Sequence, residues 1–260
     1  VDRFHSFFSA DAQTSAAFEN FMRVFSVKCK DVMSAYYQHN LVTRSNLDDD
    51  VNIAEKNCAM TAMDRLLGTN LLAKSSHKTI VNGTEVIEGV FMENAEGVDV
   101  NNTDNEEFFA AFGGKNAFST NGLKEIHDLE VLDYICGNTD RHGGNMIYKW
   151  DNKKDVIAGV TGIDNDGSFG LRVDKPNEKG GNSSALNDIN YVSGEVAERI
   201  KSLTPEKLKT ILIGYGLSNR EIDATWKRTR MMQDRILYAT DKEFKAQRDK
   251  ELEEYRRLQR

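Results

Sequence analysis

The stretch that decides the fold is YICGNTDRHGGNMIYKW, residues 134–150. Eight consecutive residues within it, 138–145, supply an Asp, an Arg, a His and two Asn side chains, and three glycines lie beside or among them. Apolar residues flank the stretch on both sides. Polar side chains crowded into a glycine-rich loop between apolar segments are typical of a functional site carried by a rigid scaffold.

The neighbouring segments predict a helix before this loop and a β-hairpin after it. Upstream, apolar residues recur at helical spacing, at Leu123, Ile126, Leu129, Leu132 and Ile135. Downstream, residues 145–166 contain two apolar runs joined by the polar turn DNKKD. If these runs pair as a hairpin, Asn145 before the first strand and Asp164 after the second lie at the same edge of the sheet.

Such a hairpin would gather oxygen ligands around one point, from Asn145, Asp164 and the nearby Asp166. A few hard oxygen ligands suit Mg²⁺ or Mn²⁺, which keeps its remaining positions for water and phosphate groups. Asp140 lies slightly apart and can orient a nucleophilic hydroxyl. The set predicts phosphoryl transfer, which depends mainly on positioning and charge neutralisation.

The same residues could also have other roles, either a purely structural one or calcium binding. Asx side chains in loops often bond to their own backbone, which would account for Asp140 and Asn145 without any chemistry. A calcium loop is disfavoured, because an EF-hand aligned on Gly167 would need an acid at Gly162 and a Glu at Val173.

The first hundred residues predict two helices followed by a small sheet. An amphipathic pattern predicts a helix over residues 16–38, and a second helix is expected from Asp50 to about Leu67, stopped by Gly68. Two or three antiparallel strands follow, with a hairpin turn at residues 82–83.

The second half predicts mostly helices, so the fold class is α+β. An acidic connector leads to a short helix at Phe108–Phe112, and residues 171–190 are rich in Gly, Asn and Ser and predict a loop. Further helices begin near Thr204 and near Ser218. The last twenty-five residues mix acidic and basic side chains, which predicts a solvated helix with i,i+4 charge pairs.

Composition places the 260-residue chain among ordinary soluble globular proteins, with 39% hydrophobic and 29% charged residues. The net charge of -7 disfavours broad binding to nucleic acid. No apolar run approaches the roughly 18 residues that cross a bilayer.

The cysteines Cys29, Cys58 and Cys136 are odd in number and widely spaced, which indicates a reducing compartment. We therefore expect a cytoplasmic protein, with export into a host cell as the alternative; the first residues resemble no signal peptide.

The order of these motifs resembles that of kinases, in which a catalytic Asp, an Asn, a hairpin and a metal-binding Asp follow one another. GNTDRHGGNMIY, residues 137–148, resembles the catalytic loop of the phosphatidylinositol 3- and 4-kinase-like superfamily, where His-Arg-Asp is reversed to Asp-Arg-His. TGIDNDGSFG, residues 161–170, resembles its metal-binding segment. The similarity to bacterial members of this group extends over about residues 51–237.

The resemblance implies a two-lobed protein-kinase-like fold with a reduced N-lobe and a mainly helical C-lobe. The N-lobe would comprise residues 1–95, with a hinge near 92–96. The C-lobe, residues 96–260, would carry the catalytic loop at 138–145 and the metal-binding segment at 162–170.

The resemblance also implies roles for individual residues. Asp140 becomes the catalytic base or hydroxyl-orienting group, and His142 supports the loop or the transferring phosphate. Asn145 and Asp164 become metal ligands, with Asp166 as a further ligand. A loop-bracing role for His142 is the structural alternative.

The nucleotide site follows from the same resemblance, and its cofactors would be ATP and Mg²⁺ or Mn²⁺. FMEN falls where adenine binds, which implies that Met92 lines the pocket and that the backbone of Glu93 and Asn94 contacts the base. Glu55 falls where a helix Glu pairs with the phosphate-binding Lys. Core packing for Met92 and a surface position for Glu55 are the alternatives.

Two features of the family, the glycine loop and the phosphate-binding Lys, have no assigned residues in this sequence. No glycine precedes Gly68, so the glycine loop over the phosphates lies upstream of this sequence, is replaced, or is absent. The Lys that would pair with Glu55 is also open, with Lys28 and Lys74 as candidates.

We predict from the sequence an ATP- and Mg²⁺-dependent phosphotransferase that acts on a protein hydroxyl. Phosphoinositide is the second choice of acceptor, because the basic residues of the 171–190 loop are interleaved with acidic ones. The basic residues are Arg172, Lys175 and Lys179, and the acidic ones are Asp174 and Glu178. The alternatives are a pseudokinase that binds nucleotide or a partner, and a kinase-like enzyme that transfers AMP or ligates amino acids.

Overall fold

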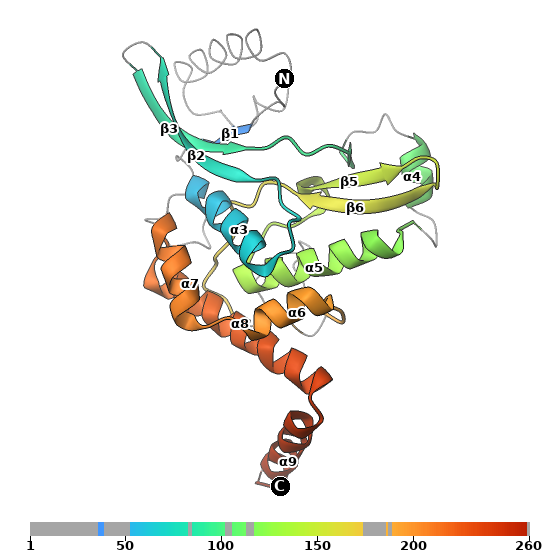
Figure 1. The fold of residues 1–260 in the computed structure, drawn as a ribbon, viewed down its shortest axis with the longest axis vertical. Coiled ribbons are helices and arrows are strands. Elements are labelled where there is room, and N and C mark those ends of the chain that lie inside the picture. Colours follow the sequence, from blue (N-terminus) through green and yellow to red (C-terminus); the bar gives the residue numbers. More distant parts are fainter. Residues whose placement is uncertain are drawn as a thin grey trace.

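The computed structural model describes residues 36–38, 53–82, 85–101, 106–112, 117–173, 186 and 189–258. These residues form helices and two small antiparallel sheets, so the α+β class is confirmed (Figure 1). No helix within these ranges has both the length and the apolar character needed to cross a membrane.

The first sheet has the strand order β1-β3-β2. Strands β2 (Ser75–Asn82) and β3 (Glu85–Met92) form the predicted hairpin, with Asn82 opposite Glu85. Residues 83–84 of its turn lie outside the described ranges.

The predicted helix over residues 16–38 is wrong at its end. Residues 36–38 form strand β1 (Tyr36–Gln38), which pairs antiparallel with β3. The open edge of β3 supplies backbone hydrogen-bond partners there, and aromatic residues suit a strand, so tertiary pairing overrides the helical spacing. The rest of that prediction, residues 16–35, and Asp50, the predicted start of the second helix, lie outside the described ranges.

The second sheet has the order β4-β5-β6 and contains the predicted hairpin. Strand β5 (Met146–Asp151) pairs with β6 (Val156–Gly162), and Met146 lies opposite Gly162. The two-residue strand β4 (Val98–Asp99) adds to the outer edge of β5. The sequence predicted only a connector at this point, because two residues carry no readable alternation.

Helix α3 (Ile53–Leu67) lies beneath the first sheet and leads towards the second (Figure 1). As predicted, the helix stops before Gly68, which has a left-handed φ of 70°. The next residues bond to the end of β6: Ala73 N–H donates to the Gly162 carbonyl at 2.9 Å, and Gly162 N–H donates to the Leu71 carbonyl at 2.8 Å. The connection after α3 is therefore tied to Gly162, the first residue of the predicted metal-binding segment 162–170.

Helix α5 (Thr120–Cys136) runs along the face of the β5–β6 hairpin (Figure 1). Helix α4 (Glu106–Phe112) matches the predicted short helix, and its Phe108 ring packs against the rings of Tyr148 and Trp150. The C-terminal half of α5 is buried in the main hydrophobic core. The core thus fixes the end of α5, from which the polar loop departs.

The C-terminal part is helical, with α6 (Gly194–Lys201), α7 (Pro205–Leu212), α8 (Asn219–Thr240) and α9 (Lys242–Leu258). The predicted starts of α7 and α8 are confirmed, because the side chains of Thr204 and Ser218 cap these helices. Most of the predicted 171–190 loop, residues 174–185 and 187–188, lies outside the described ranges.

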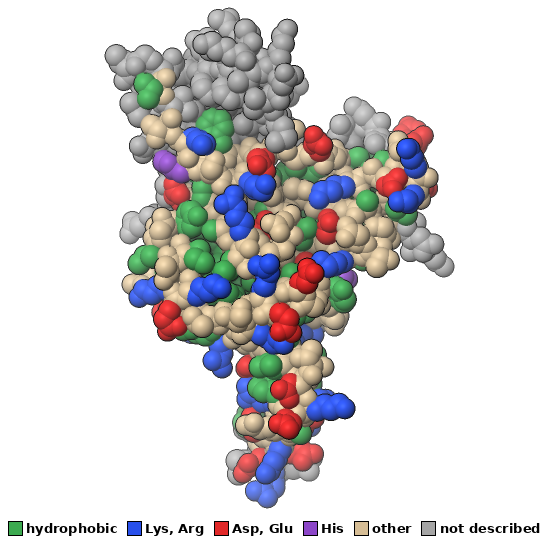
Figure 2. Space-filling model, viewed as in Figure 1, with side chains coloured by type: hydrophobic (Ala, Val, Ile, Leu, Met, Phe, Trp, Pro, Cys, Tyr) green, Lys and Arg blue, Asp and Glu red, His purple; other side chains and the backbone are tan. Residues whose placement is uncertain are grey.

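Helix α9 projects beyond the rest of the structure, and among the described elements it contacts only the end of α8 closely, where Arg248 pairs with Asp234 (Figure 1). Its surface shows interspersed acidic and basic side chains (Figure 2). The predicted i,i+4 pairing is confirmed by Lys245 and Asp249, whose charged atoms lie 2.6 Å apart.

Two of the cysteines, Cys58 and Cys136, are free and buried. Burial raises the pKa of the Cys58 thiol to about 12 and also raises that of Cys136. Both therefore behave as small apolar residues of the core.

Candidate functional site

The polar loop begins at Gly137, where α5 stops. Gly137 has a φ of 62°, and its N–H donates to carbonyls of the last turn of the helix. A Cβ at this position would lie 2.6 Å from the guanidinium of Arg228. Both the left-handed backbone and the close approach therefore require glycine.

We expect Gly137→Ala to lower the free energy of unfolding by about 1–2 kcal/mol for the left-handed backbone alone. Displacement of Arg228 should add about 1–3 kcal/mol. The matched control is Gly216→Ala, because Gly216 has a φ of 72° but no heavy atom within 4 Å of its would-be Cβ. Urea unfolding of both variants measures the difference, and equal losses would contradict the crowding at Gly137.

Arg228 on α8 connects this helix end to the segment after β6. It is fully buried, and it donates to the carbonyls of Ile135 at 2.9 Å, Gly170 at 2.8 Å and Arg172 at 2.7 Å. Burial lowers its pKa to about 10, so the guanidinium still carries its charge near neutral pH. Three carbonyls from two chain segments thus converge on one cation.

The centre of the loop is a buried ion pair between Asp133 on α5 and Arg141. The Asp133 carboxylate accepts from Arg141 Nε at 2.8 Å and Nη2 at 3.1 Å, a bidentate arrangement. It also accepts from Asn138 Nδ2 at 2.9 Å. Because Asp133 lies on a core helix, this pair fixes the loop relative to the core.

Arg141 also holds the base of the hairpin. Its Nη1 donates to the carbonyls of Asn145 and Ile163, both at 2.8 Å, and its Nη2 donates to Asn165 Oδ1. One guanidinium therefore bonds to residues on either side of the β5–β6 hairpin. This role of Arg141 was not predicted from the sequence, although its position directly after Asp140 was a possible signal.

The predicted site residues Asp140 and Asn145 lie within this network, and Asp164 lies between two residues that Arg141 contacts, Ile163 and Asn165. Asn145 Nδ2 donates to the Asp140 carbonyl at 2.8 Å, and Ile163 N–H donates to the Asn145 carbonyl at 3.0 Å. Asn145 therefore contacts residue 140 and the residue that precedes Asp164. Its amide nitrogen holds the loop, and its amide oxygen is the atom that would bind a cation.

The segment after β6 has an unusual backbone. Asp164 and Phe169 adopt left-handed φ values of 50° and 61°, which non-glycine residues rarely do. The segment is held from the polar loop, because Thr139 N–H and Oγ1 donate to the Gly167 carbonyl at 2.9 and 3.0 Å. Such conformations persist where surrounding contacts determine them, and they cluster at functional sites.

The residue types at this edge are ones that could hold a magnesium-like cation together with phosphate groups. Asp164 is half-buried, Asp166 and Asn145 are buried, and all three offer oxygen atoms. The described residues contain no cluster of three or more His, Cys, Asp or Glu side chains that could hold a metal by themselves. A cation here would need Asn145 and oxygen atoms from a ligand or water.

His142 is exposed, and its ring has a structural contact. Its Nδ1 accepts from Gly144 N–H at 3.1 Å, which caps the short 3-10 turn Gly143–Asn145. Bracing of the loop is thus observed, while contact with a phosphate stays a prediction.

The residues predicted to bind the adenine lie at the end of β3. Met92 is buried, whereas Glu93 and Asn94 are exposed. Glu93 N–H donates to the Lys74 carbonyl at 2.9 Å, so the backbone of Glu93 can offer a base only its carbonyl oxygen. Contacts with a base by these three residues stay a prediction.

Glu55 lies in the first turn of α3, and its Oε1 is 3.5 Å from His77 Nε2 on β2. Of the two candidate phosphate-binding lysines, Lys28 lies outside the described ranges. Lys74 has an exposed side chain just before β2. The pairing of Glu55 with a phosphate-binding Lys stays a prediction.

The residue after Glu55 was missed by the sequence analysis. Lys56 is fully buried, and its Nζ lies 2.7 Å from Glu221 Oε1 on α8 and 3.0 Å from the Ser168 carbonyl. Its partners lie 165 and 112 positions away along the chain, so no local pattern could have found them.

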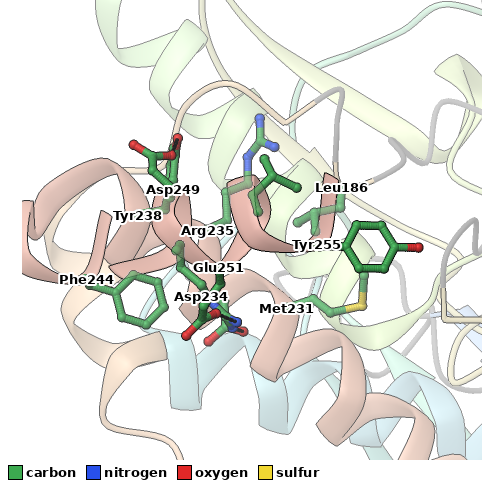
Figure 3. Close-up of a pocket in the computed structure, with 11 residues that line it drawn as sticks. Leu186, Met231, Asp234, Arg235, Tyr238, Phe244, Asp249, Glu251 and Tyr255 are labelled. Carbon is green, nitrogen blue, oxygen red and sulfur yellow. Dashed lines mark hydrogen bonds and ion pairs between the residues drawn. The ribbon is translucent and has the colours of Figure 1, made fainter. Parts of the chain in front are cut away.

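A groove of about 610 Å³ lies at a different place, between α8 and α9 (Figure 3). Its lining is Leu186, Met231, Asp234, Arg235, Tyr238, Phe244, Arg248, Asp249, Glu251, Leu252 and Tyr255. None of the predicted site residues is among them, and charges of both signs lie beside its apolar side chains. It is separate from the loop at residues 137–145.

Comparison with known proteins leaves the site to be interpreted from its geometry. No protein-family model matches the chain, and no curated protein matches it.

Proposed function

We propose that this protein is an ATP- and Mg²⁺-dependent phosphotransferase related to the phosphatidylinositol 3- and 4-kinase-like superfamily. In the proposed two-lobed fold, the β1-β3-β2 sheet belongs to a reduced N-lobe and the helices α5 to α8 to the C-lobe. The observation that carries the proposal is the contact between loop and hairpin. Arg141 bonds to the carbonyls of Asn145 and Ile163, which brings the loop of Asp140 beside the segment of Asp164.

In this proposal Asn145 and Asp164 hold the divalent cation, with Asp166 as a further ligand. When bound, Mg²⁺ would neutralise charge on the terminal phosphates of ATP. The chain's own contribution is to hold the Asp140 carboxylate where it orients an acceptor hydroxyl and takes its proton. Asp140 is half-buried and its backbone is fixed on both sides, which suits a positioned base.

The nucleotide would lie between the end of β3 and the hairpin. The carbonyl of Glu93 and the backbone of Asn94 would contact the base, and Met92 would line the pocket. Glu55 would pair with a phosphate-binding Lys. Free, buried cysteines fit a reducing compartment such as the cytoplasm.

We propose a protein hydroxyl as the acceptor and phosphoinositide as the second choice. The interleaved charges of the 171–190 loop are a poor match for an anionic lipid headgroup.

The test is incubation with ATP and Mg²⁺ beside either a generic protein substrate or vesicles that contain phosphatidylinositol, followed by mass spectrometry of both. The proposal expects addition of phosphate to the protein substrate. Addition of phosphate to the lipid alone would show that phosphoinositide, the second choice, is the acceptor. Addition of AMP would identify a kinase-like nucleotidyltransferase, and absence of any product despite ATP binding would indicate a pseudokinase.

A further inference from the structure

We propose that Lys56 and Asn57 are positioning residues that hold the segment 163–170 where Asp164 and Asp166 can bind the metal. The inference rests on the proposed function. It identifies which part of helix α3 controls that site, although neither residue would contact the metal or the nucleotide.

The two neighbouring residues bond to the same short segment. Lys56 Nζ donates to the Ser168 carbonyl at 3.0 Å, and Asn57 Oδ1 accepts from Asn165 N–H at 2.8 Å. Ser168 Oγ in turn donates to the Asn165 carbonyl at 2.7 Å, which closes the segment on itself. Asp166 lies between the two points of attachment.

The backbone of this segment needs such support. Its left-handed residues Asp164 and Phe169 lie just outside the two attachment points. A left-handed conformation costs a non-glycine residue about 1–2 kcal/mol, so without external contacts the segment would relax. Directional hydrogen bonds from α3 oppose that relaxation.

Stability alone does not explain a buried lysine here. Lys56 and Glu221 are both 0% exposed and form an ion pair at 2.7 Å. A buried ion pair is often no more stabilising than apolar residues of similar volume. An apolar pair could fill the same space, but it could not donate to the Ser168 carbonyl.

The ion pair also includes α8. Glu221 accepts from Ser218 N–H at 2.9 Å through its other oxygen, in the capping box that begins this helix. Glu221 therefore compensates the charge of Lys56 from a fixed position. The ammonium can then bond to the backbone of the segment without an unpaired buried charge.

The first experiment compares the wild type with the double variant Lys56→Met/Glu221→Met. The double variant removes the donor to Ser168 without leaving a buried unpaired charge, so it should fold. The single variant Ser218→Ala is the control, since it weakens the same capping box of α8 but retains the Lys56–Glu221 ion pair and the bond from Lys56 to Ser168. Mn²⁺ binding in the presence of ATP should weaken about 10- to 100-fold in the double variant, the loss typical of residues that orient metal ligands. In Ser218→Ala it should stay close to the wild-type value.

The second experiment does not depend on nucleotide or metal. Hydrogen exchange of the amides of residues 164–169 should rise about tenfold or more in the double variant, relative to amides of β5 in the same protein. Asn57→Ala is a second variant without any change of charge, and it should show the same local increase and the same weaker Mn²⁺ binding. It keeps the inference testable if the double variant does not fold.

Two outcomes would overturn the inference. In one, exchange in residues 164–169 rises no more than in β5 in the folded variants. In the other, the variants bind Mn²⁺ with ATP as tightly as the wild type. If the wild type itself binds no Mn²⁺ with ATP while exchange rises locally as expected, the proposed function fails and the structural role of Lys56 and Asn57 stands.

Discussion

Asp140→Ala should slow phosphate transfer by about 10²- to 10⁴-fold, the usual contribution of a positioned general base. Nucleotide binding should be nearly unchanged. The structural reason is that residue 140 holds the loop through its backbone: its N–H donates to Asn138 Oδ1 at 2.9 Å, and its carbonyl accepts from Asn145 Nδ2 at 2.8 Å. Alanine keeps both bonds and removes only the carboxylate.

The measurement is the transfer rate at saturating ATP and Mg²⁺, together with the ATP dissociation constant from titration. Asp223→Ala on α8 is the matched control, because it removes the same carboxylate from an exposed helical position. Asp140→Ala at the wild-type rate would exclude Asp140 as the catalytic base. A large loss of ATP affinity would indicate that the carboxylate instead holds the metal or the loop.

Arg141→Met should have the largest effect on folding, with a loss of about 3–5 kcal/mol in the free energy of unfolding. Arg141 is 3% exposed and pairs with the equally buried Asp133. Methionine removes the cation and leaves Asp133 as an uncompensated buried charge. The carbonyls of Asn145 and Ile163 lose their shared donor as well.

Urea unfolding measures this loss, and Arg230→Met is the control. Arg230 is exposed on α8, and its guanidinium lies 5.9 Å from the centre of the Trp226 ring, so its replacement should cost well under 1 kcal/mol. Arg141→Lys should also be destabilising, since an ammonium cannot reproduce the planar bidentate contact. An Arg141→Met variant as stable as the control would show that this ion pair does not hold the loop.

The elements with local signals could be predicted from the sequence. The β5–β6 hairpin is defined by two apolar runs and a polar turn, and the start of α8 by Ser218 followed by Glu221. Gly68 and the residues around it showed where α3 ends. Each of these signals lies within a few residues of the structure it produces.

The parts that were missed depend on distant contacts. Strand β1 exists because the edge of β3 is available to pair with it, and the spacing of apolar residues there suggested a helix. Lys56 looked like an ordinary charged residue of a helix beside Glu55. Its burial is decided by Glu221 and by the Ser168 carbonyl, which are remote in the sequence.

The residues of the candidate site divide in the same way, into those with a signal in the sequence and those defined by distant contacts. Asp140, Asn145 and Asp164 could be chosen as candidates because chemistry limits which residue types could serve the proposed phosphoryl transfer. The residues that hold them, Arg141 and Asp133, could not be selected on that ground. Their role follows from the geometry of the folded chain, where one guanidinium bonds to both the loop and the hairpin.

The central claim is that one divalent cation binds beside ATP where Asn145 meets the segment of Asp164. The most direct measurement is electron paramagnetic resonance of Mn²⁺ titrated into the protein with ATP, for the wild type, Asp164→Ala and the control Asp151→Asn at the opposite end of the β5–β6 hairpin. The account predicts a bound Mn²⁺ signal that depends on ATP, that is lost in Asp164→Ala and that is retained in Asp151→Asn. Equal Mn²⁺ binding by the wild type and Asp164→Ala, or no bound Mn²⁺ in the wild type, would contradict it.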